Sequence, residues 1–170
     1  MARRKPDPGA IYVSPRLQAS LEPMGRCALT TVTAPMGYGK TTAVNWFLAA
    51  QPPGSAIRVS IYSDSLPALW ESGRRAFRAA GLTVLEGFDC PTDPAATGLL
   101  VDTLCRELRR PEPWYLFADD LHLLPDPRMA RFLCELAARL PENVHLIAAS
   151  RDRILSGDQV LRLGGRLHRI

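Results

Sequence analysis

The segment that decides the fold runs from residue 34 to residue 42 and reads Ala34-Pro35-Met36-Gly37-Tyr38-Gly39-Lys40-Thr41-Thr42. It fits the pattern GxxxxGK[ST], except that alanine stands at the first glycine position. In such a loop, backbone N–H groups converge on phosphate oxygens at a helix N-terminus, where unpaired donors and the helix dipole favour an anion. A strand predicted at 28–32 and a helix predicted at 40–50 flank it, as the motif requires. This context favours a phosphate-binding loop (P-loop) over a simple glycine-rich turn.

The residues of this loop have separable expected roles. Gly37 and Gly39 let the backbone turn tightly and approach the phosphates. Lys40 is expected to reach the β- and γ-phosphates of a nucleoside triphosphate, and the hydroxyl of Thr41 is expected to ligate Mg²⁺. Thr42 closes the motif and is more readily explained as a residue of the following helix.

A second motif lies in the apolar run Trp114-Tyr115-Leu116-Phe117-Ala118, which is followed by Asp119 and Asp120. An apolar strand that ends in acids matches a Walker B strand, whose first acid holds Mg²⁺ directly or through water. We assign that role to Asp119, and Asp120 is the candidate that polarises the attacking water. The alternative is a helix N-cap followed by a solvated acid. His122 is more readily explained by packing or capping than by catalysis.

A third candidate follows the strand predicted at 144–149. If that strand lies between the P-loop strand and the Walker B strand, Ser150 and Arg151 come beside the γ-phosphate, as in the additional-strand class of P-loop proteins. Arginine is the favoured planar partner of phosphate, so Arg151 is a candidate sensor of ATP against ADP. An arginine at a strand end is as often a surface ion pair, and both interpretations stay open.

Strands alternate with helices along the chain, which predicts an α/β fold around a parallel sheet. We expect further strands at 56–61 and 167–170, and helices at 67–80, 98–110 and 127–140. Residues 82–97 are expected to form a loop with a possible short strand at 83–85. The predicted architecture is a three-layer α/β/α sandwich with the strand order 5-1-4-3-2.

Composition narrows the class of protein. The 170 residues, 46% of them hydrophobic, suit one domain. The net charge of +4 is carried by scattered arginines, which favours a mixed solvated surface over a nucleic-acid patch. The four cysteines show no zinc-site spacing. No secretory signal and no membrane-spanning run is visible, so a cytoplasmic location is expected by elimination.

With these motifs placed, the chain resembles the ATPase domain of the large maltose-regulator-like LuxR-type transcription factors, which belong to the signal-transduction ATPases with numerous domains (STAND). The resemblance rests on Ser14-Pro15-Arg16-Leu17, on the run 34–42, on Phe117-Ala118-Asp119-Asp120-Leu121-His122 and on Ala149-Ser150-Arg151. In that family the loop typically begins with alanine, as it does at Ala34.

The resemblance implies ATP/ADP and Mg²⁺ as cofactors, and it places Arg16 near the adenine. ATP binding would switch the domain from a closed ADP form to a self-associating form, and slow hydrolysis would reset it. The stretch from Leu161 to Leu167 is similar to the piece that follows the sensor strand in these regulators. Relatives continue into a sensor and a C-terminal helix-turn-helix, so 1–170 is interpreted as an N-terminal fragment of a larger regulator. No direct DNA binding and no membrane contact are expected from it.

Two alternatives remain from the residues themselves. Small metabolic kinases also use a P-loop of this kind, but they need an arginine-bearing lid, and residues 82–97 contain no Arg or Lys. Arg106, Arg109 and Arg110 keep that interpretation open. A nucleotide-binding module that has lost hydrolysis would show the same motifs. ATP is favoured over GTP partly because no NKxD-like segment follows a strand.

Overall fold

The sheet at the centre of the molecule has five parallel strands. A computed structural model describes residues 11–170, and its strands run in the order β2-β3-β4-β1-β5. Their bounds are β1 Leu29–Thr33, β2 Ala56–Ser60, β3 Trp114–Asp119, β4 Val144–Ser150 and β5 Leu167–Arg169. This is the predicted order 5-1-4-3-2, and the predicted α/β class is confirmed. All seven residues of β4 are buried, as expected for a central strand of a parallel sheet covered on both faces.

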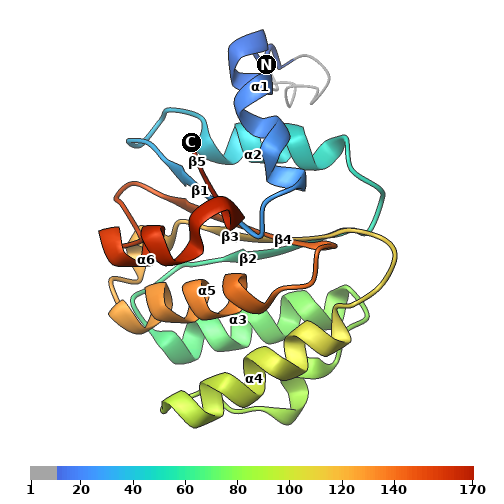
Figure 1. The fold of residues 1–170 in the computed structure, drawn as a ribbon, viewed down its shortest axis with the longest axis vertical. Helices are drawn as coiled ribbons and strands as arrows, with labels where there is room; N and C mark the ends of the chain where they lie inside the picture. Colours follow the sequence, from blue (N-terminus) through green and yellow to red (C-terminus); the bar gives the residue numbers. More distant parts are fainter. Residues whose placement is uncertain (1–10) are drawn as a thin grey trace, which may run out of the picture.

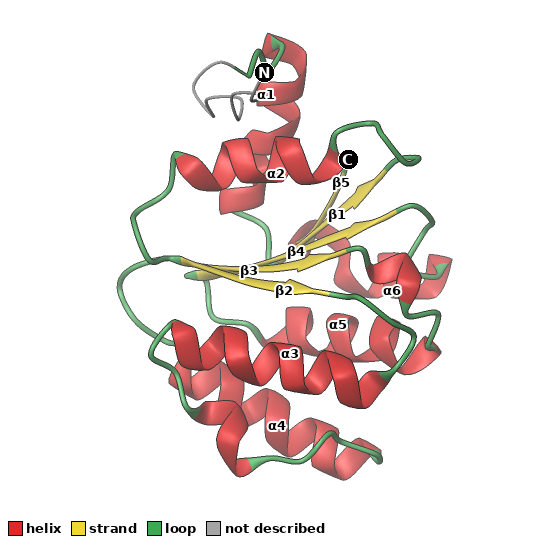
Figure 2. Ribbon diagram, turned by 180° about the vertical axis from the view of Figure 1, so that it is seen from behind, coloured by secondary structure: helices red, strands yellow, loops and turns green. Residues whose placement is uncertain are grey.

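Helices cover both faces of this sheet (Figures 1 and 2). One face is covered by α1 Pro15–Leu21 and α2 Lys40–Ala49, and the other by α3 Leu66–Ala79 and α5 Pro127–Arg139. A further helix, α4 Pro94–Glu107, lies outside α3 and α5, farther from the sheet (Figure 2). The last helix, α6 Gly157–Leu163, contacts α5. None of the helices in residues 11–170 combines the length and the apolar character that crossing a membrane requires.

The alternation of side chains along the strands divides the core into two clusters. Tyr115 and Phe117 of β3 pack toward α1 and α2, whereas Trp114 and Leu116 pack toward α3, α4 and α5. Phe117 is only 1% exposed, so its burial stabilises the fold by roughly 2–3 kcal/mol. Asp119 is two residues beyond Phe117 and therefore lies on the α2 face of the sheet.

The predicted boundaries need correction around residues 82–98. The helix predicted at 98–110 begins at Pro94, because Asp93 accepts a hydrogen bond from the backbone N–H of Ala96 at 2.8 Å and proline fits the first helical turn. The short strand suggested at 83–85 is wrong. A 3₁₀ helix (η3, Val84–Gly87) occupies this place, and Arg74 donates to the carbonyl oxygen of Leu85. A side chain thus satisfies a carbonyl that a strand would have paired with a neighbouring strand.

Two helices were not predicted, and each has a local cap. Ser14 caps α1 and accepts from the backbone N–H of Leu17, with proline at the first helical position. Ser156 and Gln159 form a reciprocal capping box at the start of α6. Both helices have seven residues, which is too short for hydrophobic periodicity to be visible.

The stretch from Leu161 to Leu167 has a structural role. Arg166 donates to the carbonyl oxygens of Ala137 and Leu140, at 3.0 and 2.8 Å, and so satisfies backbone acceptors at the C-terminal end of α5. Because β5 follows directly and pairs with β1, this contact sets the path of the chain back into the sheet.

Candidate functional site

The segment between β1 and α2 forms a tight loop at the carboxyl end of the sheet. Gly37 and Gly39 have φ angles of 83° and 77°, in the left-handed region that favours glycine. Gly39 is the N-cap residue of α2 and supplies no side-chain cap, so the first N–H groups of this helix are left for another acceptor. Met36 and Tyr38 are 74% and 77% exposed. The predicted loop between strand and helix is therefore present, with the helix N-terminus open to an anion.

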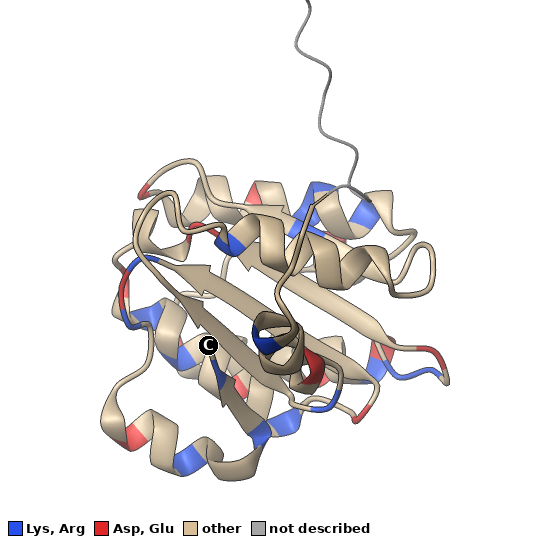
Figure 3. Cartoon of the chain, turned by 90° about the horizontal axis from the view of Figure 1, so that it is seen from above, with Lys and Arg blue, Asp and Glu red and all other residues tan. Residues whose placement is uncertain are grey.

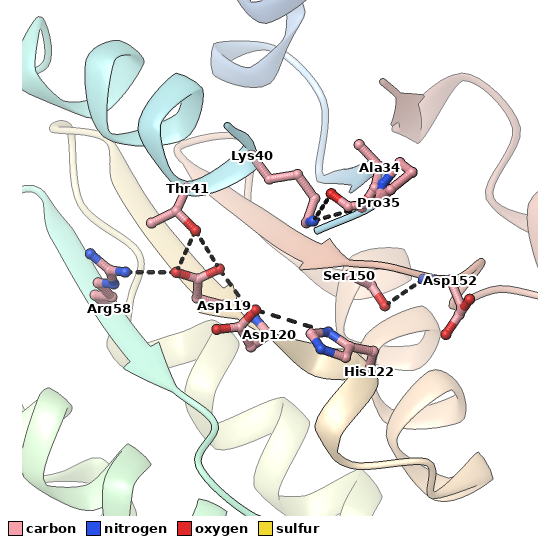
Figure 4. Close-up of polar contacts among 10 residues, drawn as sticks. All are labelled: Ala34, Pro35, Lys40, Thr41, Arg58, Asp119, Asp120, His122, Ser150 and Asp152. Carbon is pink, nitrogen blue, oxygen red and sulfur yellow. Dashed lines mark hydrogen bonds and ion pairs between the residues drawn. The ribbon is translucent and has the colours of Figure 1, made fainter. Parts of the chain in front are cut away.

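Lys40 lies against the loop that it follows (Figure 4). Its ammonium group donates to the carbonyl oxygens of Ala34 and Pro35, at 2.6 and 3.0 Å. The backbone N–H of Ala34 in turn donates to the carbonyl oxygen of Ser150 at 3.3 Å, which ties the start of the loop to the end of β4. The positive charge is thus held at the loop itself, where a phosphate chain would lie.

Thr41 and Asp119 meet although they are 78 residues apart in the sequence (Figure 4). The hydroxyl of Thr41 donates to both carboxylate oxygens of Asp119, at 3.1 and 3.0 Å. Asp119 is 3% exposed and also accepts from the backbone N–H of Asp120 at 3.1 Å. The two residues predicted to hold the metal ion are therefore adjacent.

The oxygen atoms present suit Mg²⁺. This ion requires octahedral oxygen coordination and is commonly held by one or two protein ligands together with water and phosphate oxygens. The hydroxyl of Thr41 and the carboxylate of Asp119 supply such a pair. Within residues 11–170 no group of three or more His, Cys, Asp and Glu side chains could hold a metal by itself. A cation at this place would therefore bind most tightly when a nucleotide phosphate supplies further oxygen ligands.

Arg58 completes the surroundings of Asp119, and sequence reasoning missed it. Its Nη2 atom donates to Oδ2 of Asp119 at 2.6 Å, and its guanidinium carbon lies 5.3 Å from the centre of the Phe117 ring. The side chain of Arg58 is 42% exposed and that of Asp119 is 4% exposed. The signal that could have revealed it is physical: a buried carboxylate needs a compensating charge, and β2 is the strand next to β3.

Asp120 differs from Asp119 in backbone conformation, in exposure and in the groups that it contacts. Its φ and ψ are 61° and 38°, and among residues 11–170 no other non-glycine residue has a positive φ. Its side chain is 50% exposed and lies 3.9 Å from Nδ1 of His122. The side chain of His122 is 8% exposed, and neither ring nitrogen has a hydrogen-bond partner in the described part of the chain. An exposed carboxylate beside a buried one suits the role of a base for water, which stays a prediction for Asp120.

The third candidate lies at the end of β4, and β4 does run between β1 and β3. Ser150 is buried, and its hydroxyl accepts from the backbone N–H of Asp152 at 3.3 Å. Arg151 is exposed, and in the described range no acidic side chain pairs with it. The alternative of a surface ion pair therefore finds no support, while the sensor role of Arg151 stays a prediction.

Arg16 lies on α1, which contacts α2 on the P-loop face of the sheet. It is exposed, and its backbone carbonyl accepts from the hydroxyl of Ser20. Its predicted position near the adenine stays a prediction. A cavity of about 320 Å³ lies on the opposite face of the sheet, among α3, α4 and α5, and its lining includes Trp70, Phe77 and Leu100. This cavity is apolar and lies away from the loop, so it is not the nucleotide site.

Comparison with known proteins places the fold. No protein-family model matches the chain. A STAND protein with a tetratricopeptide repeat sensor from Pyrococcus horikoshii is similar with a TM-score of 0.57 and 14% identity, over 94% of this chain and 23% of that one. A chain from the structure of Drosophila ORC bound to DNA is similar with a TM-score of 0.53 and 14% identity, over 91% of this chain and 89% of that one. A chain from the structure of Drosophila ORC bound to AT-rich DNA and Cdc6 is similar with a TM-score of 0.52 and 15% identity, over 91% of this chain and 56% of that one.

The strand order and the loop between β1 and α2 define the class as a P-loop NTPase fold. Its solved neighbours include a STAND protein and a chain of ORC, and at these identities the likeness concerns the fold alone. The chain spans about a quarter of the length of the STAND protein that it resembles.

Proposed function

We propose that this chain binds ATP and ADP together with Mg²⁺ and acts as a nucleotide-dependent switch with slow hydrolysis. The observation that carries the proposal is the contact of Thr41 with Asp119 beside an open helix N-terminus. The loop and the N-terminus of α2 would hold the phosphates, and Lys40 would contact the β- and γ-phosphates. Thr41 and Asp119 would hold Mg²⁺. Asp120 would orient the attacking water, and Arg151 would sense the γ-phosphate.

The second part of the proposal concerns the larger protein to which this domain would belong. The motifs resemble those of LuxR-type regulators, and the similar STAND protein, 23% of which is covered by the match, has a tetratricopeptide repeat sensor. We propose that the chain is the nucleotide-binding part of a larger regulator and that it self-associates in the ATP state. Its charges are interspersed along helices and loops (Figure 3), which supports the proposal that this part does not itself bind DNA.

The alternative of a small kinase is less well supported. A kinase lid must reach the phosphates, but the segment that follows α3 is fixed at a distance from the P-loop face. The indole of Trp70 and the guanidinium of Arg74 both donate to the carbonyl oxygen of Phe88, at 3.2 and 2.7 Å. These contacts hold the segment against α3, on the opposite side of the sheet from α2. A module that binds nucleotide without hydrolysis remains a variant of the leading proposal.

Calorimetric titration of the purified chain with ATP, ADP and GTP in Mg²⁺ tests the proposal. We expect saturable binding of both adenine nucleotides and a loss of ATP affinity of about 100-fold or more in Lys40→Ala, because the variant removes the charge at the β- and γ-phosphates. Arg78→Ala, an exposed substitution on α3, is the matched control and should bind as the wild type does. No binding to the folded wild type would contradict the proposal. Transfer of phosphate to a metabolite would favour the kinase.

A further inference from the structure

Asp119 is held by three donors, and only one of them carries a charge. The hydroxyl of Thr41 and the backbone N–H of Asp120 are neutral donors, whereas Arg58 is a cation. Moving a carboxylate out of water is costly unless it is paired and hydrogen-bonded. Because the Asp119 side chain is 4% exposed, the guanidinium of Arg58 supplies the charge that this burial requires.

The guanidinium of Arg58 can move away from Asp119 into solvent. It lies on β2, the edge strand next to β3, and its side chain is 42% exposed. The ring of Phe117 supports the guanidinium, with 5.3 Å from the guanidinium carbon to the ring centre. In residues 11–170, Asp119 is its one hydrogen-bonding partner through the side chain. Rotation into solvent therefore breaks one ion pair and one cation–π contact, and water replaces both.

Arg58 and Mg²⁺ compete for the same carboxylate. Thr41 can ligate the metal through an oxygen lone pair while its hydroxyl still donates a hydrogen bond to Asp119. The contact between Thr41 and Asp119 is therefore compatible with a bound metal ion. The guanidinium is different, because it occupies a lone pair of Oδ2 and brings a positive charge beside an incoming divalent cation.

We propose that Arg58 is a built-in substitute for Mg²⁺, which neutralises Asp119 in the metal-free protein and is displaced when Mg²⁺ binds. The inference rests on the proposed function for the step in which Mg²⁺ arrives with a nucleotide. Arg58 is a positioning residue: it holds the carboxylate of Asp119 in place beside Thr41. It also sets the Mg²⁺ concentration that the site requires, since the metal must first replace the guanidinium.

A thermal unfolding cycle without nucleotide tests the pairing. We expect Arg58→Gln to lower the Tm of the metal-free protein by roughly 3–6 °C, because it leaves a buried carboxylate without a countercharge. The same substitution in an Asp119→Asn background should leave the Tm nearly unchanged. Millimolar Mg²⁺ alone should restore the Tm of Arg58→Gln and raise that of the wild type much less. Arg78→Gln, which breaks an exposed ion pair with Glu86, is the matched control.

Calorimetric ATP titrations at a series of Mg²⁺ concentrations test the competition. The Mg²⁺ concentration for half-maximal ATP affinity should fall about 3- to 10-fold in Arg58→Gln, since a competing cation is gone. Arg58→Lys keeps the charge and should stay within about 2-fold of the wild type. It also provides the comparison if the glutamine variant does not fold. A residue with a merely structural role would change the Tm and leave this Mg²⁺ midpoint in place.

The outcomes separate the two proposals. Equal Tm losses from Arg58→Gln in the wild-type and Asp119→Asn backgrounds, or a Mg²⁺ midpoint that is unchanged or raised in Arg58→Gln, would overturn the inference even if the wild type binds ATP. If the wild type binds no nucleotide while the Tm cycle shows coupling and Mg²⁺ alone rescues Arg58→Gln, the inference stands and the proposed function fails.

Discussion

The two faces of the sheet differ in what their side chains contact. On the α1/α2 face, β3 carries Tyr115, Phe117 and Asp119, and the series passes from apolar core to a buried charge within five residues. On the α3/α5 face, β3 carries Trp114, Leu116 and Ala118, which all belong to the apolar core. The same strand thus supplies apolar core on both sides and a buried charge only at the end of the α1/α2 side, because successive side chains alternate between the faces.

This difference separates the candidate nucleotide site from the larger apolar cluster in space. The α3/α5 face contacts three helices and an apolar cavity, and none of the charged residues within 11–170 is buried there. The polar contacts of Lys40, Thr41 and Arg58 all lie at the carboxyl ends of strands on the other face (Figure 4), the end where ligands bind in open α/β sheets. Substitutions on the two faces are therefore expected to affect different measurements.

The largest expected effect on the core face comes from Leu100→Ala in α4. Leu100 is fully buried and lines the apolar cavity, so the truncation removes hydrophobic contacts and enlarges an existing void. We expect a loss of roughly 2–5 kcal/mol in the free energy of unfolding, measured by urea denaturation. ATP affinity of the folded fraction should stay within about 2-fold of the wild type. A large change in affinity would show that the two faces are coupled.

A smaller effect of opposite sign is expected from Gly73→Ala in α3. A Cβ at this position would meet the Leu85 side chain at 3.7 Å, an ordinary contact distance. The substitution also removes the cost of glycine in a helix interior, so we expect the free energy of unfolding to rise by about 0.5–1 kcal/mol. Chemical denaturation measures it, and Gly87→Ala outside the α-helices is the comparison. A loss of stability would mean that α3 and η3 are closer than the structure has them.

The smallest effect concerns pH and lies on the α1/α2 face. Nδ1 of His145 is 3.0 Å from the carbonyl oxygen of Cys27, and its ring stacks on Tyr115. Burial lowers the pKa of His145 below its ordinary value of 6.5, against the opposing effect of the Cys27 carbonyl. The unfolded chain therefore binds a proton near pH 6.5 that the folded chain takes up only at lower pH. The stability that the folded state gains from keeping His145 neutral is present in full above pH 6.5. It is lost as the pH falls from 6.5 toward the pKa of His145 in the folded state.

Tm measurements at about pH 7.5 and about pH 5.5, on either side of the ordinary histidine pKa, check this expectation. The wild type should lose more stability between these two pH values than His145→Asn, which cannot be protonated there. Equal losses would show that His145 does not contribute to the acid sensitivity of the fold.

The sequence was sufficient for the sheet and for the two nucleotide motifs, because both are local patterns with a strong physical cause. Long apolar runs predicted β3 and β4, and the run from Ala34 to Thr42 predicted the loop between β1 and α2. Arg58 was missed because no local pattern marks it. Its contact depends on the register in which β2 pairs with β3, which brings together residues 61 positions apart. The start of α4 was misplaced because residues 82–97 were expected to form a loop, although a proline such as Pro94 is well tolerated in the first turn of a helix.

The backbone of Asp120 has a consequence for how this protein can change. A left-handed conformation costs a residue with a Cβ about 1 kcal/mol, and glycine adopts it freely. Replacement of Asp120 by glycine would relieve this strain, which the larger conformational entropy of glycine in the unfolded chain offsets in part, while it deletes a carboxylate from the edge of the site. Selection for folding stability alone would favour relief of the strain at this position, for example by glycine. If Asp120 orients the attacking water as proposed, stability and activity make opposing demands at this position, and an engineering effort aimed only at robustness would remove the proposed base.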